Sequence, residues 1–182
     1  VEFWQLPAHG IGERTQVTRG AQILRWGGVP SPDGARVAHH DKNHVLWMTT
    51  LKDGATVRVD QSQVEDIADL AWSPDSRWLA YVTWAENFQR ILRIYDVEGG
   101  RVLDATTDRY ESYSPAWSAD GQRLYFLSDR HLVSLVRDPW GPRQPDPYFE
   151  RITRIYELAL LPGLRSPFEP PNELVKDEDS LE

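Results

Sequence analysis

The sequence predicts an all-β protein, a partial β-propeller of about three and a half four-stranded antiparallel blades. A turn motif close to Ser-Pro-Asp-Gly occurs three times, starting at Ser31, Ser73 and Ser118, with spacings of 42 and 45 residues. Short apolar runs flank each copy, and aromatic residues make up 11% of the chain. A repeat of roughly 40–45 residues that contains several short strands is typical of propeller blades.

The turn motif has a physical explanation. Proline presets φ, the aspartate side chain caps the turn, and glycine accepts a positive φ. The runs that follow the second and third copies, 78–82 and 124–127, are apolar on both faces. This pattern indicates strands that are covered on each side by a neighbouring blade. Trp72 and Trp117, which directly precede the turns, are therefore expected to pack between blades.

Each full blade is predicted to contain an innermost strand before the turn motif, a second strand after it, a third with alternating polarity, and a fourth after a glycine-containing turn. In chain order, strands are predicted at residues 2–6, 15–18, 23–26, 45–48, 56–59, 67–72, 78–82, 91–97, 101–104, 114–117, 124–127 and 152–161. Because a propeller needs about 4–8 blades to close, the sequence is interpreted as part of a larger propeller.

The repeat divides the chain into half a blade, two full blades, an incomplete last blade with three strands, and a tail. The corresponding segments are 1–20, 21–62, 63–108, 109–161 and 162–182. The tail has six acidic residues against Arg165 and Lys176, together with four of the chain's 13 prolines. It is predicted to be an acidic, proline-rich linker that leaves the propeller.

The composition limits the class of function. The chain has 182 residues and a net charge of -8, so it lacks the basic character expected of a nucleic-acid-binding protein. It contains no cysteine, which excludes disulfides and thiolate chemistry. Its longest apolar runs are far shorter than the roughly 20 residues of a membrane helix. We therefore expect no nucleic-acid partner and no membrane partner.

Several stretches resemble a known family. The run from Ala71 to Tyr81, with its Trp-Ser-Pro-Asp core, is similar to the repeat of TolB-type propellers. Residues 107–118 and 124–130 look like the last blade of the second propeller of tricorn-type serine proteases. The Arg-Ile-Tyr-Glu-Leu run at 154–158 and the Ser-Pro-Phe-Glu-Pro run at 166–170 follow in the order seen at the exit from that propeller. The resemblance covers residues 15–182.

The resemblance implies a function. Tricorn proteases are large cytoplasmic serine peptidases that trim peptides and assemble as oligomers, and their second propeller is thought to guide substrates. Their catalytic residues belong to later domains, so the resemblance implies no catalytic residue and no cofactor in this segment. The expected partners are peptide substrates, other domains of the same polypeptide, and further copies of the parent protein.

Two alternatives remain open from the sequence. A TolB-like propeller would act only as a protein–protein interaction module, and a prolyl-peptidase propeller would accompany a hydrolase domain with a G-x-S-x-G motif. The serines of the turn motif recur because the turn needs them, which makes a nucleophilic role for any of them the weaker interpretation. Whether the chain belongs to an enzyme depends on sequence outside it.

Three histidines within six residues raise the question of a metal site. His39, His40 and His44 are suitable zinc ligands by type. Adjacent residues of a strand point to opposite faces, so His39 and His40 are poorly placed to share one ion. The repeat also aligns His39 with Tyr81 and Phe126. We therefore expect packing roles and no metal.

The topology of a blade places the loops between second and third strands on the same face as the loops that enter the first strand. If the parent protein guides peptides, this face and the channel it surrounds are the expected contact surface. An arginine there suits a peptide carboxylate because its planar fork matches that group. The long proline-rich loop 137–148 belongs to the same face. The candidate residues are Arg109, Tyr110, Arg130, His131 and Trp140.

Overall fold

The computed structural model describes residues 2–20, 22–131 and 152–170, and these residues form thirteen β-strands. The strands are β1 Trp4–Gln5, β2 Thr15–Gln16, β3 Arg25–Pro30, β4 Arg36–Asp41, β5 Val45–Thr50, β6 Thr56–Gln61, β7 Ala68–Trp72, β8 Trp78–Trp84, β9 Arg90–Asp96, β10 Arg101–Asp104, β11 Ser112–Trp117, β12 Arg123–Ser128 and β13 Arg154–Ala159. The described residues contain no helix.

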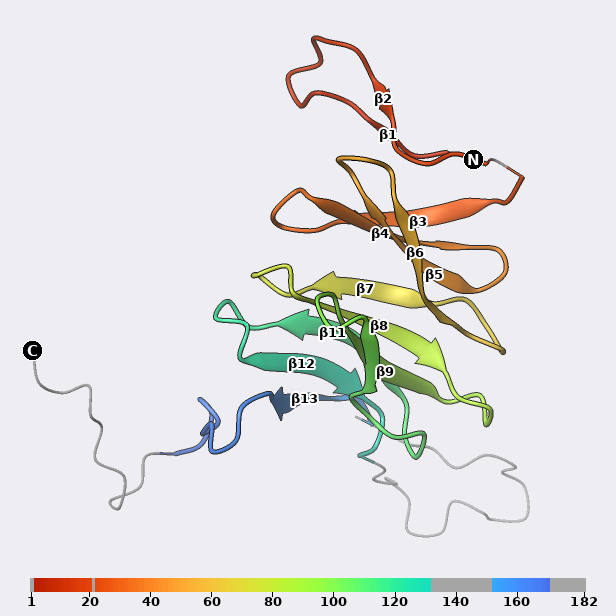
Figure 1. Ribbon diagram of the computed structural model, residues 1–182. Helices are drawn as coiled ribbons and strands as arrows, with labels where there is room; N and C mark the ends of the chain where they lie inside the picture. The colour runs from red at the N-terminus through yellow and green to blue at the C-terminus, as the bar shows by residue number, and fades with distance from the viewer. Residues whose placement is uncertain (1, 21, 132–151, 171–182) are drawn as a thin grey trace, which may run out of the picture.

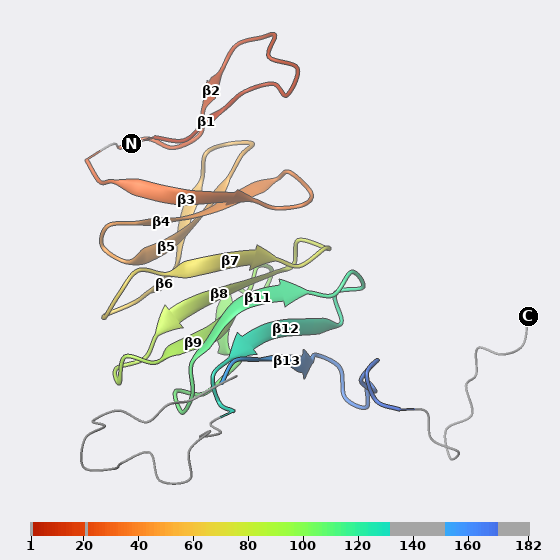
Figure 2. The ribbon, with the colours of Figure 1, turned by 180° about the vertical axis from the view of Figure 1, so that it is seen from behind.

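The strands form four antiparallel sheets that follow one another along the molecule (Figures 1 and 2). A two-stranded sheet, β1-β2, comes first, and two four-stranded sheets, β3-β4-β5-β6 and β7-β8-β9-β10, follow it. The last sheet, β11-β12-β13, has three strands in the described residues. The predicted all-β partial propeller is confirmed.

The turn motif has the same hydrogen bonds in all three repeats. The Ser31 hydroxyl donates to Oδ1 of Asp33 (2.5 Å) and accepts the Arg36 N–H (2.9 Å). The second repeat forms the same pair of bonds around Ser73, and the third around Ser118. In the first repeat, the hydrogen bond from the Ser31 hydroxyl holds the pKa of the Asp33 carboxyl below its usual value. The motif therefore closes each hairpin between innermost and second strands.

The tryptophan before the turn joins one blade to the preceding one. Nε1 of Trp72 donates to the carbonyl oxygen of Val29 (3.0 Å), and Nε1 of Trp117 donates to that of Ala71 (3.0 Å). Both bonds span nearly one full repeat in sequence. In the first full blade this position is Pro30, which has no side-chain donor. The Trp-Ser-Pro-Asp pattern thus specifies a turn and an inter-blade bond together.

The second strands form the centre of the core. Leu79 and Tyr81 form one cluster with Leu46 and Met48 of the preceding blade, and all four side chains are buried. Val82, which has the opposite orientation, packs against Phe126 and Leu92 in the following interface. The two-sided apolar pattern of residues 78–82 is therefore explained by a blade on each side.

Each innermost strand contains a bulge at the same repeat position. Gly27, Asp69 and Ser114 have φ values of 69°, 51° and 52°, and the pairing register shifts at each of them. A Cβ on Gly27 would lie 2.4 Å from Nε2 of His40, so only glycine fits there. The sequence predicted the first of these strands at residues 23–26, whereas β3 continues past its bulge and ends at Pro30, directly before the turn motif.

His39 and His40 point to opposite sides of β4. The His39 ring lies 5.0 Å from the ring of Phe3 in the half blade, and its Nε2 is 2.9 Å from Oγ1 of Thr49. The His40 ring contacts Trp26, 5.5 Å away. Within the residues that the structure describes, no three His, Cys, Asp or Glu side chains gather around a possible ion position. Burial lowers the pKa of both rings, that of His39 from 6.5 to about 4.

The low pKa of His39 makes stability depend on pH. The folded chain keeps this ring neutral, whereas the unfolded chain binds a proton below about pH 6.5. The stabilisation is therefore complete above pH 6.5 and is lost progressively between pH 6.5 and 4. Urea unfolding at pH 7.5 and pH 5 should show a smaller pH effect in His39→Phe than in the wild type. A His9→Phe variant, changed at an exposed histidine, should keep the wild-type pH effect, and equal effects in all three would contradict the assignment.

The inter-blade bond of Trp72 is testable by a substitution that keeps most of the ring. Trp72→Phe removes the indole donor and with it the bond to the Val29 carbonyl of the preceding blade. We expect a loss of about 1–2 kcal/mol in the free energy of unfolding. Trp4→Phe is the matched control because Trp4 is 46% exposed, and it should cost much less. Equal losses for both variants in chemical unfolding would show that the bond adds nothing.

Candidate functional site on the loop face of the last blade

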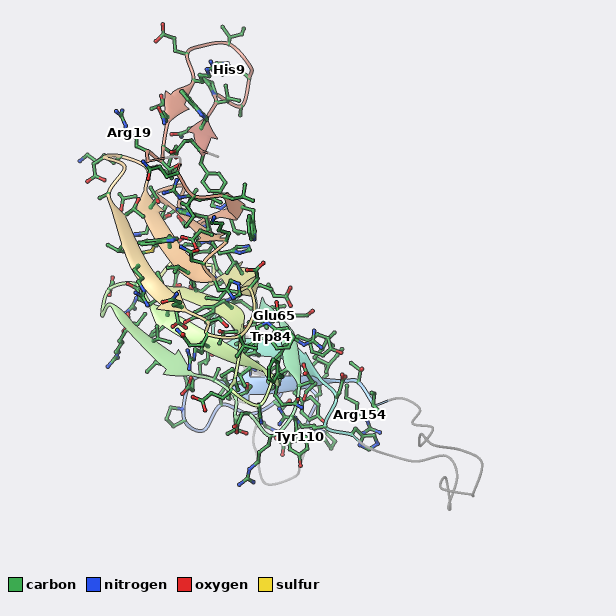
Figure 3. All side chains as sticks on the ribbon, turned by 90° about the vertical axis from the view of Figure 1, so that its right-hand side faces the viewer. His9, Arg19, Glu65, Trp84, Tyr110 and Arg154 are labelled. Carbon is green, nitrogen blue, oxygen red and sulfur yellow. The ribbon has the colours of Figure 1, made fainter. Side chains whose placement is uncertain are left out.

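The loops that enter the innermost strands meet the loops between second and third strands on one face, as the topology predicted. Asn87 Nδ2 donates to the carbonyl of Asp108 (2.9 Å), and Trp84 Nε1 donates to that of Asp66 (3.2 Å). We call this surface the loop face; in the described residues it comprises 42–44, 62–67, 85–89, 105–111 and 129–131. Figure 3 looks onto it and shows Glu65, Trp84 and Tyr110 in succession.

Arg130 lies among three aromatic rings at the loop-face end of the last sheet. Its guanidinium carbon is 4.5 Å from the ring centre of Tyr156, 5.5 Å from that of Phe126 and 5.6 Å from that of Tyr110. Contacts of this kind hold a cation by the negative face of each ring. The rings come from three elements: β13, β12 and the loop before β11. They fix the plane of the guanidinium.

Two hydroxyl groups hold the edge of the same guanidinium. Nε of Arg130 donates to Oγ of Ser128 (2.9 Å), and Nη2 lies 3.4 Å from Oγ of Ser112. Within the described part of the chain, no ion pair joins Arg130 to a carboxylate. Rings and hydroxyls orient the cation, and none of these described partners carries a negative charge.

A second arginine nearby, Arg90, contacts both an aromatic ring and a carboxylate. The guanidinium of Arg90 lies 4.2 Å from the ring centre of Tyr113, and its Nε is 2.5 Å from Oε2 of Glu111. The Tyr113 hydroxyl donates to Oδ1 of Asp129 (3.0 Å). Arg90 is therefore neutralised by its own carboxylate. The two arginines differ in the charge each offers to a bound group.

The structure brings together some of the residues that the sequence singled out. Tyr110 and Arg130 are in contact, Arg109 is exposed beside Tyr110, and His131 is half-buried next to Arg130. Trp140 lies outside the described residues. Sequence reasoning missed Arg90, Tyr113 and Tyr156; the aromatic content of the strands was a signal for the two tyrosines, and Arg90 had none. The sequence also predicted that the second strand of this blade ends at residue 82, whereas β8 continues to Trp84.

A polar cavity of about 560 Å³ lies on the same face, between the first and second full blades. Arg93 lines it and forms ion pairs with Asp60 (3.0 Å) and Asp104 (2.8 Å). The Tyr81 hydroxyl donates to Asp60 (2.7 Å), and burial raises the pKa of Tyr81, so the group stays protonated. This cluster joins two blades, and its one arginine is already paired with two carboxylates, which leaves no free positive charge in it. Arg130 is accordingly the better candidate for binding an anionic group.

The comparison with protein families identifies the chain. The model of the tricorn protease second beta propeller domain matches residues 3–182. The chain belongs to this family. The two full blades, the last blade and the segment after β13 all lie inside the match, so the assignment to this propeller family covers nearly the whole chain.

Relatives of known name are far longer than this chain. Tricorn protease homolog 1 of Streptomyces coelicolor is 33% identical over 135 residues, which cover 74% of this chain and 11% of that protein. The tricorn protease of Thermoplasma volcanium is 31% identical over 144 residues, covering 75% of this chain and 14% of that protein. The matched part of this chain therefore spans about one-eighth of the length of these relatives.

Solved structures agree on the fold. The crystal structure of the tricorn protease superposes with a TM-score of 0.76 at 22% identity, covering 86% of this chain and 15% of that one. TolB from Acinetobacter baumannii superposes with a TM-score of 0.55 at 15% identity, covering 90% of this chain and 36% of that one. In the described residues, no helix has the length and hydropathy of a bilayer span.

Proposed function

We propose that this propeller domain belongs to a tricorn-type serine peptidase and guides peptide substrates toward a catalytic domain carried elsewhere in a longer polypeptide. Membership of the tricorn second-propeller family supports the setting. The small share of each relative that the chain covers, 11–14%, supports a longer parent. The proposal includes a cytoplasmic, homo-oligomeric hydrolase, in line with the absence of cysteine.

The observation that carries the proposal is the environment of Arg130. Three rings and two hydroxyls fix its guanidinium on the loop face, without a carboxylate among the described residues. A fixed planar fork suits the carboxylate or a backbone carbonyl of a peptide, and less side-chain entropy is lost on binding. The neighbouring Tyr110, 43% exposed, adds a ring on which peptide side chains can pack.

A TolB-like interaction module is the alternative, because TolB from Acinetobacter baumannii shares the fold over 90% of this chain. In that case the same loop face would bind a folded partner, with Tyr110 and Arg130 as anchors. The two functions differ in whether the parent protein cleaves peptides.

The role of Arg130 is tested in the full-length protein with short fluorogenic peptides. Arg130→Ala should raise KM about ten- to a hundredfold and leave kcat nearly unchanged, because a charge-assisted hydrogen bond contributes about 1.5–3 kcal/mol to binding. Arg130→Lys keeps the positive charge but loses the planar guanidinium. Its KM should lie between that of the wild type and that of Arg130→Ala. Arg19→Ala, at an exposed arginine of the half blade, is the matched control.

Two results would count against the proposal. An unchanged KM in a folded Arg130→Ala protein would remove Arg130 from the substrate path. A full-length protein without activity on any peptide, but with a protein partner whose binding Arg130→Ala weakens, would support the interaction module instead. Circular dichroism of each variant separates these outcomes from a loss of folding.

A further inference from the structure

The polar cavity between the first and second full blades has features of a binding site of its own. Its volume is about 560 Å³, and it lies at the loop face. Strands β6, β8, β9 and β10 contribute to its lining, together with the loop residues 62–64, 85–86 and 106–108. Two blades therefore build this cavity, and its polar groups come from several separate segments.

One buried hydroxyl in the lining has no partner among the described residues. Thr83 is 1% exposed, and its Oγ1 forms no hydrogen bond with these residues. Side chains alternate along a strand, so Thr83 points to the same side of β8 as Tyr81. The Tyr81 hydroxyl donates to Asp60 of the first full blade (2.7 Å), so this side faces the interface that contains the cavity. A bound group that donates to Thr83 would remove the cost of an unpaired buried hydroxyl.

The equivalent residues of the other two blades are satisfied within the chain. Two residues beyond the aligned histidine and aromatic positions, the repeat places Asp41, Thr83 and Ser128, all of which are buried. Asp41 accepts the indole N–H of Trp47 (2.7 Å), and the Ser128 hydroxyl donates to the carbonyl of Glu111 (2.5 Å). Thr83 differs from both because it lines a cavity and lacks such a bond in the described chain.

The cavity lining has an excess of negative charge. Glu86, Asp104 and Asp108 line it together with one cation, Arg93. Arg93 pairs with Asp104 (2.8 Å) and also with Asp60 (3.0 Å). Across the described ranges, no ion pair joins Glu86 or Asp108 to a basic side chain. A positively charged group in the cavity would therefore be attracted by two further carboxylates.

The arrangement suits an organic cation better than a metal ion. Among the residues that the structure places, no three His, Cys, Asp or Glu side chains gather closely enough to hold a metal. The lining carboxylates come from the loop after β8, from β10 and from the loop before β11. Val64, Trp84 and Ile91 add apolar surface to the same cavity. A primary ammonium group has three donors, and its aliphatic chain can cover apolar surface.

We propose that this cavity binds a primary ammonium group carried on an aliphatic chain. The Thr83 hydroxyl accepts one N–H of the ammonium, the carboxylates of Glu86 and Asp108 supply the opposite charge, and Trp84 and Ile91 contact the aliphatic part. The ammonium belongs to a lysine side chain of a peptide or to a free diamine, which share this chemistry. The lysine source rests on the proposed peptide guidance, whereas a free diamine does not.

Binding is tested in the full-length protein with the aliphatic diamine cadaverine, and pentanediol is the neutral control. Calorimetry at low ionic strength should detect binding of the diamine and none of the diol. Glu86→Gln combined with Asp108→Asn should weaken cadaverine binding about tenfold, because two exposed ion pairs are lost. The matched control, Glu13→Gln with Glu65→Gln, removes two exposed carboxylates outside the lining and should leave the affinity unchanged. Absence of cadaverine binding, or equal affinities in both double variants, would overturn the proposal.

Thr83→Val separates a binding role from a structural one. Valine keeps the shape of threonine and removes a hydroxyl without a described partner, so the Tm of the unliganded protein should stay the same or rise. Its affinity for cadaverine should fall about tenfold. Thr49→Val, which removes a buried hydroxyl bonded to His39 and Thr56, should instead lower the Tm and keep cadaverine binding. A lower Tm of Thr83→Val with unchanged affinity would make Thr83 structural and contradict the proposal.

Fluorogenic peptides that differ by one lysine or norleucine distinguish the two sources of the ammonium group. A lower KM for the lysine peptide in the wild type, lost in Thr83→Val, would support a peptide lysine as the occupant. Cadaverine binding with equal KM values for both peptides would support a free diamine. Absence of cadaverine binding together with a raised KM in Arg130→Ala would reject this site and retain the proposed peptide guidance.

Discussion

One hydrogen bond sets the geometry of the stack: the indole N–H at the end of an innermost strand donates to a carbonyl of the preceding blade. Trp72 and Trp117 form this bond over 3.0 Å each. The same residue adjoins the Ser-Asp turn, so the bond ties the position of a hairpin to the position of its neighbour. The buried second strands then pack at a fixed spacing. The loop face and the cavity between the two full blades both inherit their positions from this arrangement.

The repeat made much of the fold predictable. A period of 42–45 residues gave the order of the strands, because turn chemistry and two-sided burial act on neighbouring residues. The bulges at Gly27, Asp69 and Ser114 were not predictable, since a positive φ at Asp or Ser has no clear local signal. The predicted strand at 23–26 stopped where the bulge begins, whereas β3 continues beyond it to Pro30. The motif therefore predicts where strands lie better than where each one ends.

The candidate site was less predictable for a different reason. Tyr110 and Arg130 were expected on one face, but their contact spans 20 residues and depends on the register between β11 and β12. Arg90 and Tyr113 are joined across two blades in the same way. Topology alone identifies the face of a side chain. Among the described residues, Arg90 has a carboxylate partner and Arg130 has none, and this difference depends on packing that the sequence does not reveal.

The contacts of the half blade have a consequence for unfolding. Its strands β1 and β2 have two residues each, and it is held to the rest mainly by Glu2 with Arg25 (3.2 Å) and by Phe3 with His39. In the part of the chain that the structure describes, the main contacts between sheets join neighbouring sheets, so cooperativity passes from sheet to sheet, as in linear repeat proteins. Such a chain unfolds first at the terminal sheet that has the fewest contacts with its neighbour. The half blade should open first, and the two complete sheets should form the last unit to melt.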